Sequence, residues 1–161
     1  MIVQDELFGP ITLDGLWTGE TSITFFGKRY TIMLEIYGDG DDEISPGQRE
    51  AYSRFKADED RIVKESEERI FEYYLEIFDD YRDMYLEDSE ELADENIPRI
   101  SSAEELLELI EPASLLIRGD IGDGTRRLGI LFNCTWEPEH GLGVSILNEK
   151  IDEVGSQDVA L

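Results

Sequence analysis

The chain has 161 residues, of which 39 are acidic and 14 basic, and its net charge is −25. Hydrophobic residues make up 40% of the sequence, which argues against disorder and predicts one domain over residues 1–161. A surface this acidic repels nucleic acid and anionic lipid, so direct binding to nucleic acid or to a membrane is not expected.

Three observations bear on location. No run of about 18 apolar residues occurs, so no membrane span is expected. The first residues lack the basic and apolar regions of a secretory signal. Cys134 is the only cysteine, which excludes an intrachain disulfide and suits a reducing compartment. We therefore expect a cytoplasmic protein, and its oligomeric state stays open.

The first predicted elements are two strands joined by a tight turn. Residues 16–25 are rich in threonine, isoleucine and aromatic residues, and residues 29–37 alternate apolar and polar side chains. This period of two is typical of a half-buried strand. Gly27 supplies the turn, so the sequence predicts an N-terminal hairpin. The Gly- and Asp-rich run 38–42 then ends the sheet.

Two helices are predicted next. Ser45 is a suitable N-cap and Pro46 a suitable first residue for a helix that ends near Phe55. A long amphipathic helix follows, because apolar residues recur every four positions from Ile62 to Phe78. The apolar period fails at residues 87–96, where we expect the helix to fray.

The last third of the sequence returns to strands. The run Ser101-Ser102, with Glu104 and Glu105 after it, resembles a capping box for a short helix that Pro112 would end. Four strands then alternate with turns at 120–124 and 148–149; the strands are predicted at 114–118, 127–135, 142–147 and 150–154. The fold class is therefore α+β: a mainly antiparallel sheet with an N-terminal hairpin, central helices including one long acidic amphipathic helix, and C-terminal strands.

About half of the net charge lies on the predicted long helix and the segment after it. Residues 57–95 hold 17 acidic and four basic residues, a net charge of −13. A row of carboxylates can imitate nucleic-acid phosphates and dock onto a basic groove, although such a row is also typical of a solvated helix face. Tyrosine is enriched in binding surfaces, although Tyr81 and Tyr85 on this helix would also fit a hydrophobic core. The candidate partner-binding residues are Asp79, Asp80, Asp83, Glu87, Asp88, Tyr81 and Tyr85.

The only cysteine and the only histidine, Cys134 and His140, lie close together in the sequence. Cys134 sits in a strand-like apolar run, so we interpret it as a buried residue and assign no catalytic residue. One cysteine and one histidine are too few for a zinc site. The acidic turns at 39–43 and 120–124 lack the ligand order of an EF-hand, so neither a metal nor a cofactor is expected. A catalytic or small-ligand site around Glu139 and His140 stays open beside a purely structural turn.

The segment around His140 resembles the C-terminal signature of a bacterial domain family of unknown function. The residues that carry the likeness, and that we interpret as a structural turn and its surroundings, are Trp136, Glu139, His140, Gly141, Gly143, Gly155 and Asp158. Shorter likenesses lie at Phe8-Gly9, at Trp17-x-Gly19 and at Gln48-x-x-Ala51-Tyr52-x-x-Phe55. The resemblance implies no activity; it suggests an immunity or accessory role.

These observations favour a non-enzymatic binding protein. The sharpest form of this hypothesis is an immunity or inhibitor protein for a basic bacterial partner, with the long acidic helix as the recognition element. The alternative is an enzyme, or a protein that binds a small ligand or metal, with its site around Glu139 and His140.

Overall fold

The computed structural model describes residues 1–38, 43–119 and 122–161. Its strands form one sheet in which spatial order follows chain order. They are β1 (Ile2–Asp5), β2 (Gly9–Asp14), β3 (Leu16–Phe25), β4 (Lys28–Ile36), β5 (Ile110–Ile117), β6 (Arg127–Cys134), β7 (Leu142–Leu147) and β8 (Lys150–Gly155). All neighbours are antiparallel except β4 and β5, which run parallel. The α+β class with a mainly antiparallel sheet is confirmed.

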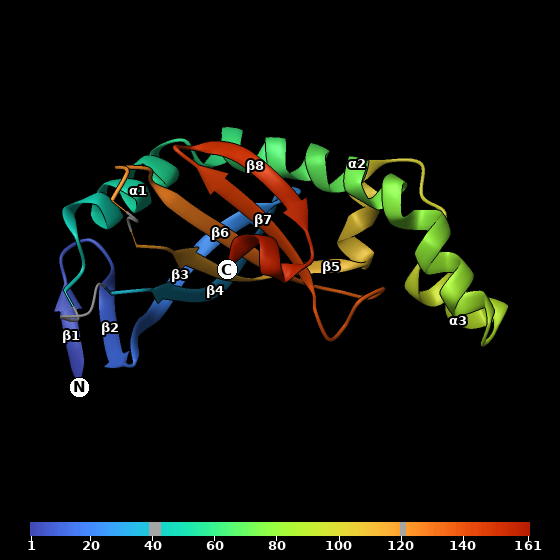
Figure 1. Cartoon of the computed structure of the whole chain (residues 1–161), viewed down its shortest axis with the longest axis horizontal. Coiled ribbons are helices and arrows are strands. Elements are labelled where there is room, and N and C mark those ends of the chain that lie inside the picture. The colour runs from blue at the N-terminus through green and yellow to red at the C-terminus, as the bar shows by residue number, and fades with distance from the viewer. Residues whose placement is uncertain (39–42, 120–121) are drawn as a thin grey trace.

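The helices occupy the long crossover between β4 and β5 (Figure 1). They are α1 (Pro46–Ala57), α2 (Glu59–Leu86), α3 (Glu90–Asn96) and the 3₁₀ turn η1 (Ala103–Glu108), and a second 3₁₀ turn, η2 (Gln157–Ala160), follows β8. The apolar sides of α1 and α2 pack on one face of the sheet. Within the described ranges, no helix combines the length and apolar character needed to cross a membrane.

The predicted N-terminal hairpin is confirmed as β3 and β4. Phe26 and Gly27 form its turn with φ angles of 49° and 76°, values that a two-residue hairpin turn requires. Glu67 of α2 accepts a hydrogen bond from the backbone N–H of Phe26 at 2.6 Å. The turn is therefore fixed to the helix layer as well as to its own strands.

Strands β1 and β2 were not predicted. The turn between them is held by Asp5, whose Oδ1 accepts the backbone N–H of Leu7 at 2.8 Å. The guanidinium of Arg49 on α1 donates to both oxygens of Asp5 and, with these backbone hydrogen bonds, holds the pKa of that carboxyl far below its usual range. The hairpin thus depends on a contact with a helix 44 residues away, which no local pattern reveals.

Both predicted helices are present, and the first begins at Pro46 as predicted. Ser45 Oγ accepts the N–H of Gln48 at 3.1 Å, and Gln48 Oε1 accepts the N–H of Ser45 at 2.9 Å, which is a capping box. The four-residue stripe of α2 is buried, with Ile62, Ile70 and Tyr74 fully covered. Burial of this stripe holds α2 on the sheet.

Two expectations for the segment after α2 were wrong. Residues 90–96 do not fray but form α3, because Ser89 Oγ caps the N–H of Leu92 at 3.0 Å and acidic residues favour a helix N-terminus. Pro112 does not end the short helix, which stops at Glu108. Pro112 lies instead inside β5, at an irregularity in the pairing with β6, where a residue without an N–H is tolerated. Residues 39–42 and 120–121 of the predicted turns lie outside the described residues.

The C-terminal turn η2 covers part of the sheet face opposite the helices. Three strands present a glycine toward it, at Gly129, Gly143 and Gly155. A Cβ atom on Gly129 would come within 2.7 Å of Ala160, and one on Gly155 within 2.9 Å of Val159. The close approach of η2 to β6, β7 and β8 therefore requires glycine at these positions.

Candidate functional site

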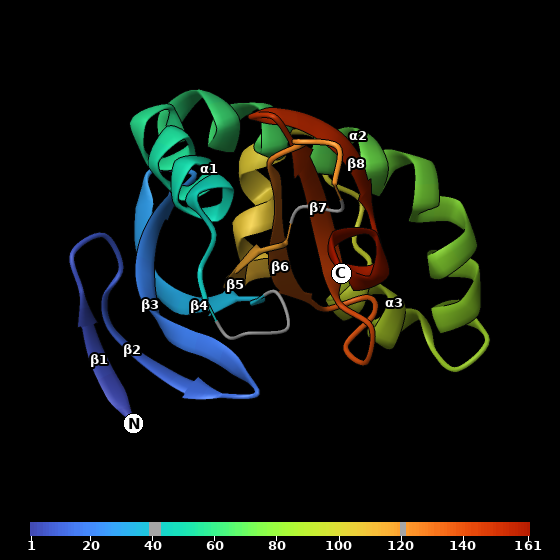
Figure 2. The same ribbon diagram turned by 60° about the vertical axis from the view of Figure 1, so that its left-hand side comes forward.

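The outer side of α2 carries an acidic surface, which we define as Glu76, Asp79, Asp80, Asp83, Glu87 and Asp88. All six side chains are exposed. Each of the first five lies three or four residues from another of them along α2 and its C-cap, so they share one side of the helix. Asp88 follows them in the turn after α2. Figure 2 shows that the C-terminal half of α2 extends beyond the strands, and Figure 1 shows α3 beside it, also past the strand ends. The acidic surface therefore projects away from the body of the sheet.

No ion pair compensates the acidic surface within the described residues. Arg82 is the only basic residue between positions 73 and 95. Its guanidinium turns toward α3, where it contacts Asp94 at 2.7 Å and donates to the carbonyl oxygen of Ile97 at 3.0 Å. The carboxylates of the acidic surface thus face solvent and one another.

This placement of charge costs stability. The last turn of α2 contains no basic residue, although the C-terminal end of a helix carries a partial negative charge that favours cations. Asp79 and Asp83 repel each other at a spacing of four residues, as do Asp83 and Glu87. A surface that lowers the stability of its own helix is typical of a functional site rather than of a charge distribution selected for folding.

Exposed apolar side chains flank the acidic surface. Met84 is 60% exposed and Leu75 54% exposed, and Leu86 and Leu92 are also exposed. Single exposed apolar residues are ordinary; these four lie on the C-terminal half of α2 and on α3, the same part of the molecule as the acidic surface.

Tyr81 and Tyr85 do not belong to this exposed surface. Both are half-buried on the side of α2 that faces the loop between β6 and β7. Tyr81 Oη donates to Glu137 Oε2 at 3.0 Å, and Tyr85 Oη donates to the carbonyl oxygen of Trp136 at 3.0 Å. Burial and the contact with Glu137 raise the pKa of Tyr81 to about 12. The two tyrosines join the C-terminal half of α2 to the loop. We call this half of α2, together with α3, the acidic arm.

Trp136 anchors this loop in the core. Its ring is buried and meets the ring of Tyr74 edge-on at 5.1 Å, a favoured aromatic geometry. Thr135 Oγ1 donates to the carbonyl oxygen of Asn96 at the end of α3. The loop between β6 and β7 is thus held by α2 and by the end of α3, and the two regions singled out in the sequence are neighbours in the fold.

The glycines of the C-terminal motif have structural roles. Gly141 has a φ of +60°, and a Cβ there would come within 2.7 Å of the carbonyl oxygen of Phe132. Gly143 and Gly155 admit η2, which contains Asp158. The backbone N–H of Gln157 donates to the carbonyl oxygen of His140 at 3.2 Å. The glycines of the motif therefore allow the turn at Gly141 and the close packing of η2 on the sheet.

His140, Glu139 and Asp158 are the exposed members of the motif. His140 Nδ1 lies 3.0 Å from Glu137 Oε1, so its hydrogen-bonding partner is Glu137 rather than the neighbouring Glu139. Glu137, followed by the weaker fields of Glu139 and Asp158, raises the pKa of His140. One carboxylate therefore serves both Tyr81 and His140, a connection that the sequence did not reveal.

Cys134 is buried, and burial raises the pKa of its thiol to about 12. A protonated, covered thiol is a poor nucleophile, which agrees with its interpretation as a core residue. Among the described residues, no group of three histidine, cysteine or acidic side chains is arranged to hold a metal ion.

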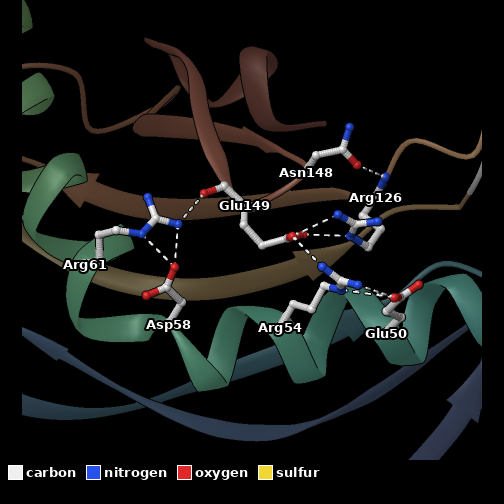
Figure 3. Close-up of polar contacts among 7 residues, drawn as sticks. All are labelled: Glu50, Arg54, Asp58, Arg61, Arg126, Asn148 and Glu149. Atoms are coloured by element: carbon white, nitrogen blue, oxygen red, sulfur yellow. Dashed lines mark hydrogen bonds and ion pairs between the residues drawn. The ribbon is translucent and has the colours of Figure 1, made fainter.

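A further polar cluster fixes the other end of α2 (Figure 3). Glu149, in the turn between β7 and β8, forms a bidentate ion pair with Arg126 at 2.7 and 2.8 Å. Arg54 of α1 approaches the same carboxylate at 3.8 Å, and Arg61 of α2 donates to the carbonyl oxygen of Glu149 at 2.9 Å. The cluster ties the junction of α1 and α2 to the sheet, and so helps to set the direction in which the acidic arm projects.

Residues 7–161 match the model of a domain family described as a domain of unknown function, DUF6985. The chain belongs to this family. The match begins at Leu7, so β1 lies outside the DUF6985 range and the β6–β7 loop, η2 and the acidic surface lie within it. Neither the curated proteins nor the solved structures include a match to the chain.

Proposed function

We propose that this protein is a non-enzymatic binding protein whose acidic surface docks onto a basic protein partner. The observation that carries the proposal is a row of exposed carboxylates without basic partners, placed at the C-terminal end of α2 where they lower the stability of the helix. A cationic partner would remove this repulsion on binding. Oppositely charged surfaces also speed association and suppress wrong partners.

The spacing of the carboxylates favours a partner that binds nucleic acid. Five carboxylates, with Glu76 and Glu87 at the ends, lie along about 17 Å of helix, which gives a mean spacing of about 4 Å. One strand of DNA carries a phosphate every 3.4 Å or so along the helix axis. We therefore propose an immunity or inhibitor role against a basic bacterial protein, in which α2 occupies the surface that would hold a phosphate backbone. The single buried thiol fits a reducing cytoplasm.

Affinity capture with a charge-reversed variant tests this proposal. The wild type and the variant Asp79→Lys/Asp80→Lys/Asp83→Lys are used as baits for source-cell lysate at low salt, with elution by a salt gradient. We expect a basic protein to be retained by the wild type and lost by the variant, because the complementary field is removed. The retained protein is then purified and titrated against both baits, to establish direct binding.

A matched variant separates specific docking from general attraction. Asp14→Lys/Asp152→Lys/Glu153→Lys makes the same change in net charge at exposed positions away from the acidic arm. Retention of the partner by this control supports docking at the acidic surface. Equal loss from both variants, or retention by all three baits, would reject the proposal.

The alternative function is a small-ligand or catalytic site at His140. It is favoured by the pair of His140 with Glu137, because an exposed imidazole that is oriented by a carboxylate is a common acid–base arrangement. In this alternative His140 would exchange the proton and Glu137 would orient the ring. Turnover or ligand binding that is lost in a normally folded His140→Ala protein would support it over the binding role.

A further inference from the structure

A hollow lies on the sheet face opposite α1 and α2, away from the acidic surface. It is a groove of about 960 Å³ that crosses from β2 to β6. Its lining is formed by Pro10, Thr12, Thr18, Gly19, Glu20, Thr31, Ile32, Met33, Glu111, Pro112, Ala113 and Asn133. The turn η2 contacts β6, β7 and β8, whereas the groove extends over β2 to β6.

Two irregularities border the groove. A Cβ on Gly19 of β3 would come within 2.9 Å of Ile11 and 3.1 Å of the carbonyl oxygen of Pro10, so glycine lets β2 approach closely on one side. On the other side, the pairing of β5 with β6 shifts between Pro112 and Ser114, which leaves Ala113 out of register. The shift at Ala113 bends β5 locally.

The groove combines carboxylates, hydroxyls and an apolar floor. Glu20 and Glu111 are exposed at its lining, and the described lining residues include no lysine, arginine or histidine. Met33 is 49% exposed between them, an unusual residue for the open face of a sheet. Three threonines and Asn133 offer donors and acceptors. This chemistry complements a cationic chain with hydrogen-bonding groups along its length.

The dimensions indicate an extended segment. Five strands from β2 to β6 are separated by four spacings, or about 19 Å, which an extended chain crosses in roughly six residues. Glu20 is in register with Met33 and Ser114. Because Ala113 is an extra residue in the pairing with β6, Glu111 lies two strands away and about two residues along, or about 12 Å from Glu20. Two long side chains four residues apart in an extended peptide span this distance.

We propose that this groove binds a short, extended peptide segment with two basic side chains, which pair with Glu20 and Glu111. The main chain of the peptide hydrogen-bonds to the threonines and Asn133, and its remaining side chains lie on Met33. This site is separate from the acidic surface of α2 and does not depend on the function proposed for it.

A defined peptide tests the proposal. The probe is a blocked hexapeptide with lysine at its first and fifth positions and alanine elsewhere, and its control carries glutamine in place of lysine. Both are titrated into the ¹⁵N-labelled protein at low salt. We expect saturable shifts of backbone amide signals in β3, β4 and β5 with the lysine peptide, and weaker binding of the control peptide.

Variants decide whether the groove is the site. Glu20→Gln/Glu111→Gln should lower the affinity for the lysine peptide about tenfold, since two partly exposed charge pairs are lost. Met33→Lys, at a half-exposed position that tolerates the change, should abolish binding by repulsion. Asp79→Asn/Asp80→Asn/Asp83→Asn should change it little. Shifts confined to α2 and α3, no saturation, or unchanged affinity in both groove variants would overturn the proposal and leave the proposed function of the acidic surface standing.

Discussion

At the scale of single residues, the contact that most changes the interpretation of the sequence is that between His140 and Glu137. Glu137 accepts a hydrogen bond from Tyr81 and pairs with His140. The β6–β7 loop thereby connects α2 to the one histidine of the sequence, a residue type whose ordinary pKa lies near neutral pH. Because the pKa of His140 is raised in the folded protein, its charged form stabilises the loop.

We predict that Glu137→Gln lowers the pKa of His140 toward its ordinary value, since Glu137 is the main cause of the rise. The pair stabilises the folded loop fully below the unfolded pKa of histidine, and this contribution is lost as the pH rises through the higher folded value. The imidazole resonances, followed by NMR across pH 5–9, provide the measurement. Glu139→Gln serves as the control, with a smaller shift; an unchanged titration in Glu137→Gln would contradict the contact.

Sequence reasoning located this loop but not its chemistry. Trp136, Gly141 and Gly143 were interpreted as a structural turn, and their burial and close backbone contacts agree with that role. Glu137 was passed over because nothing in its neighbours distinguishes it from the other acidic residues. Its partners are set by the path of the turn and by α2, 56 residues away.

At the scale of elements, η2 illustrates how a short turn depends on the strands beneath it. The glycines of β6, β7 and β8 leave no side chain between the sheet and η2. A Cβ atom on Gly143 would lie 3.0 Å from backbone atoms of Ser156 and Gln157. A methyl group there must displace main chain rather than a flexible side chain.

Gly143→Ala should therefore destabilise the protein by about 1–3 kcal/mol, the usual cost of overpacking. Chemical denaturation followed by circular dichroism measures the effect. The matched control is Gly47→Ala in α1, where the nearest atom lies at 3.8 Å. Alanine there should stabilise the helix by up to about 1 kcal/mol. Equal effects of the two substitutions would contradict the proposed packing of η2.

The elements with strong periodicity could be predicted from the sequence, and those fixed by distant contacts could not. The buried stripe of α2 and the alternation in β4 are local signals, and both predicted elements are present. Strands β1 and β2 rely on Asp5 and Arg49. The groove across β2 to β6 depends on how Gly19 and Pro112 shape neighbouring strands, so its residues could not be brought together from the sequence.

At the scale of the whole molecule, charge is the dominant property. Basic side chains tie the junction of α1 and α2 to the sheet through Glu149, whereas the far end of α2 has only Arg82 among its acidic residues. The long helix α2 therefore runs from a region where acidic and basic side chains pair, around Glu149, to the acidic surface, whose carboxylates have no ion pair among the described residues. Like charges at the acidic surface oppose folding most strongly at low ionic strength.

We predict that Asp79→Asn/Asp80→Asn/Asp83→Asn raises the free energy of unfolding at low salt by roughly 0.5–1.5 kcal/mol, because it removes repulsion and an unfavourable interaction with the helix dipole. The gain should shrink in 1 M salt, where charges are screened. Urea denaturation at the two salt concentrations gives both values. The control Asp14→Asn/Asp152→Asn/Glu153→Gln makes the same change in charge, and it should raise the free energy of unfolding by less. A destabilised triple variant of α2 would show that these carboxylates support the fold.

The parallel pairing of β4 with β5 has a consequence for how the chain reaches this structure. On either side of it, β1 to β4 and β5 to β8 are series of hairpins between consecutive strands, which are local contacts and form quickly. The pairing of β4 with β5 closes a loop from Ile36 to Ile110. The chain must lose the conformational entropy of this loop before β4 and β5 can hydrogen-bond. The two meanders are thus natural folding units, and the buried stripe of α2, which lies within the closing loop, offers the apolar surface on which they join.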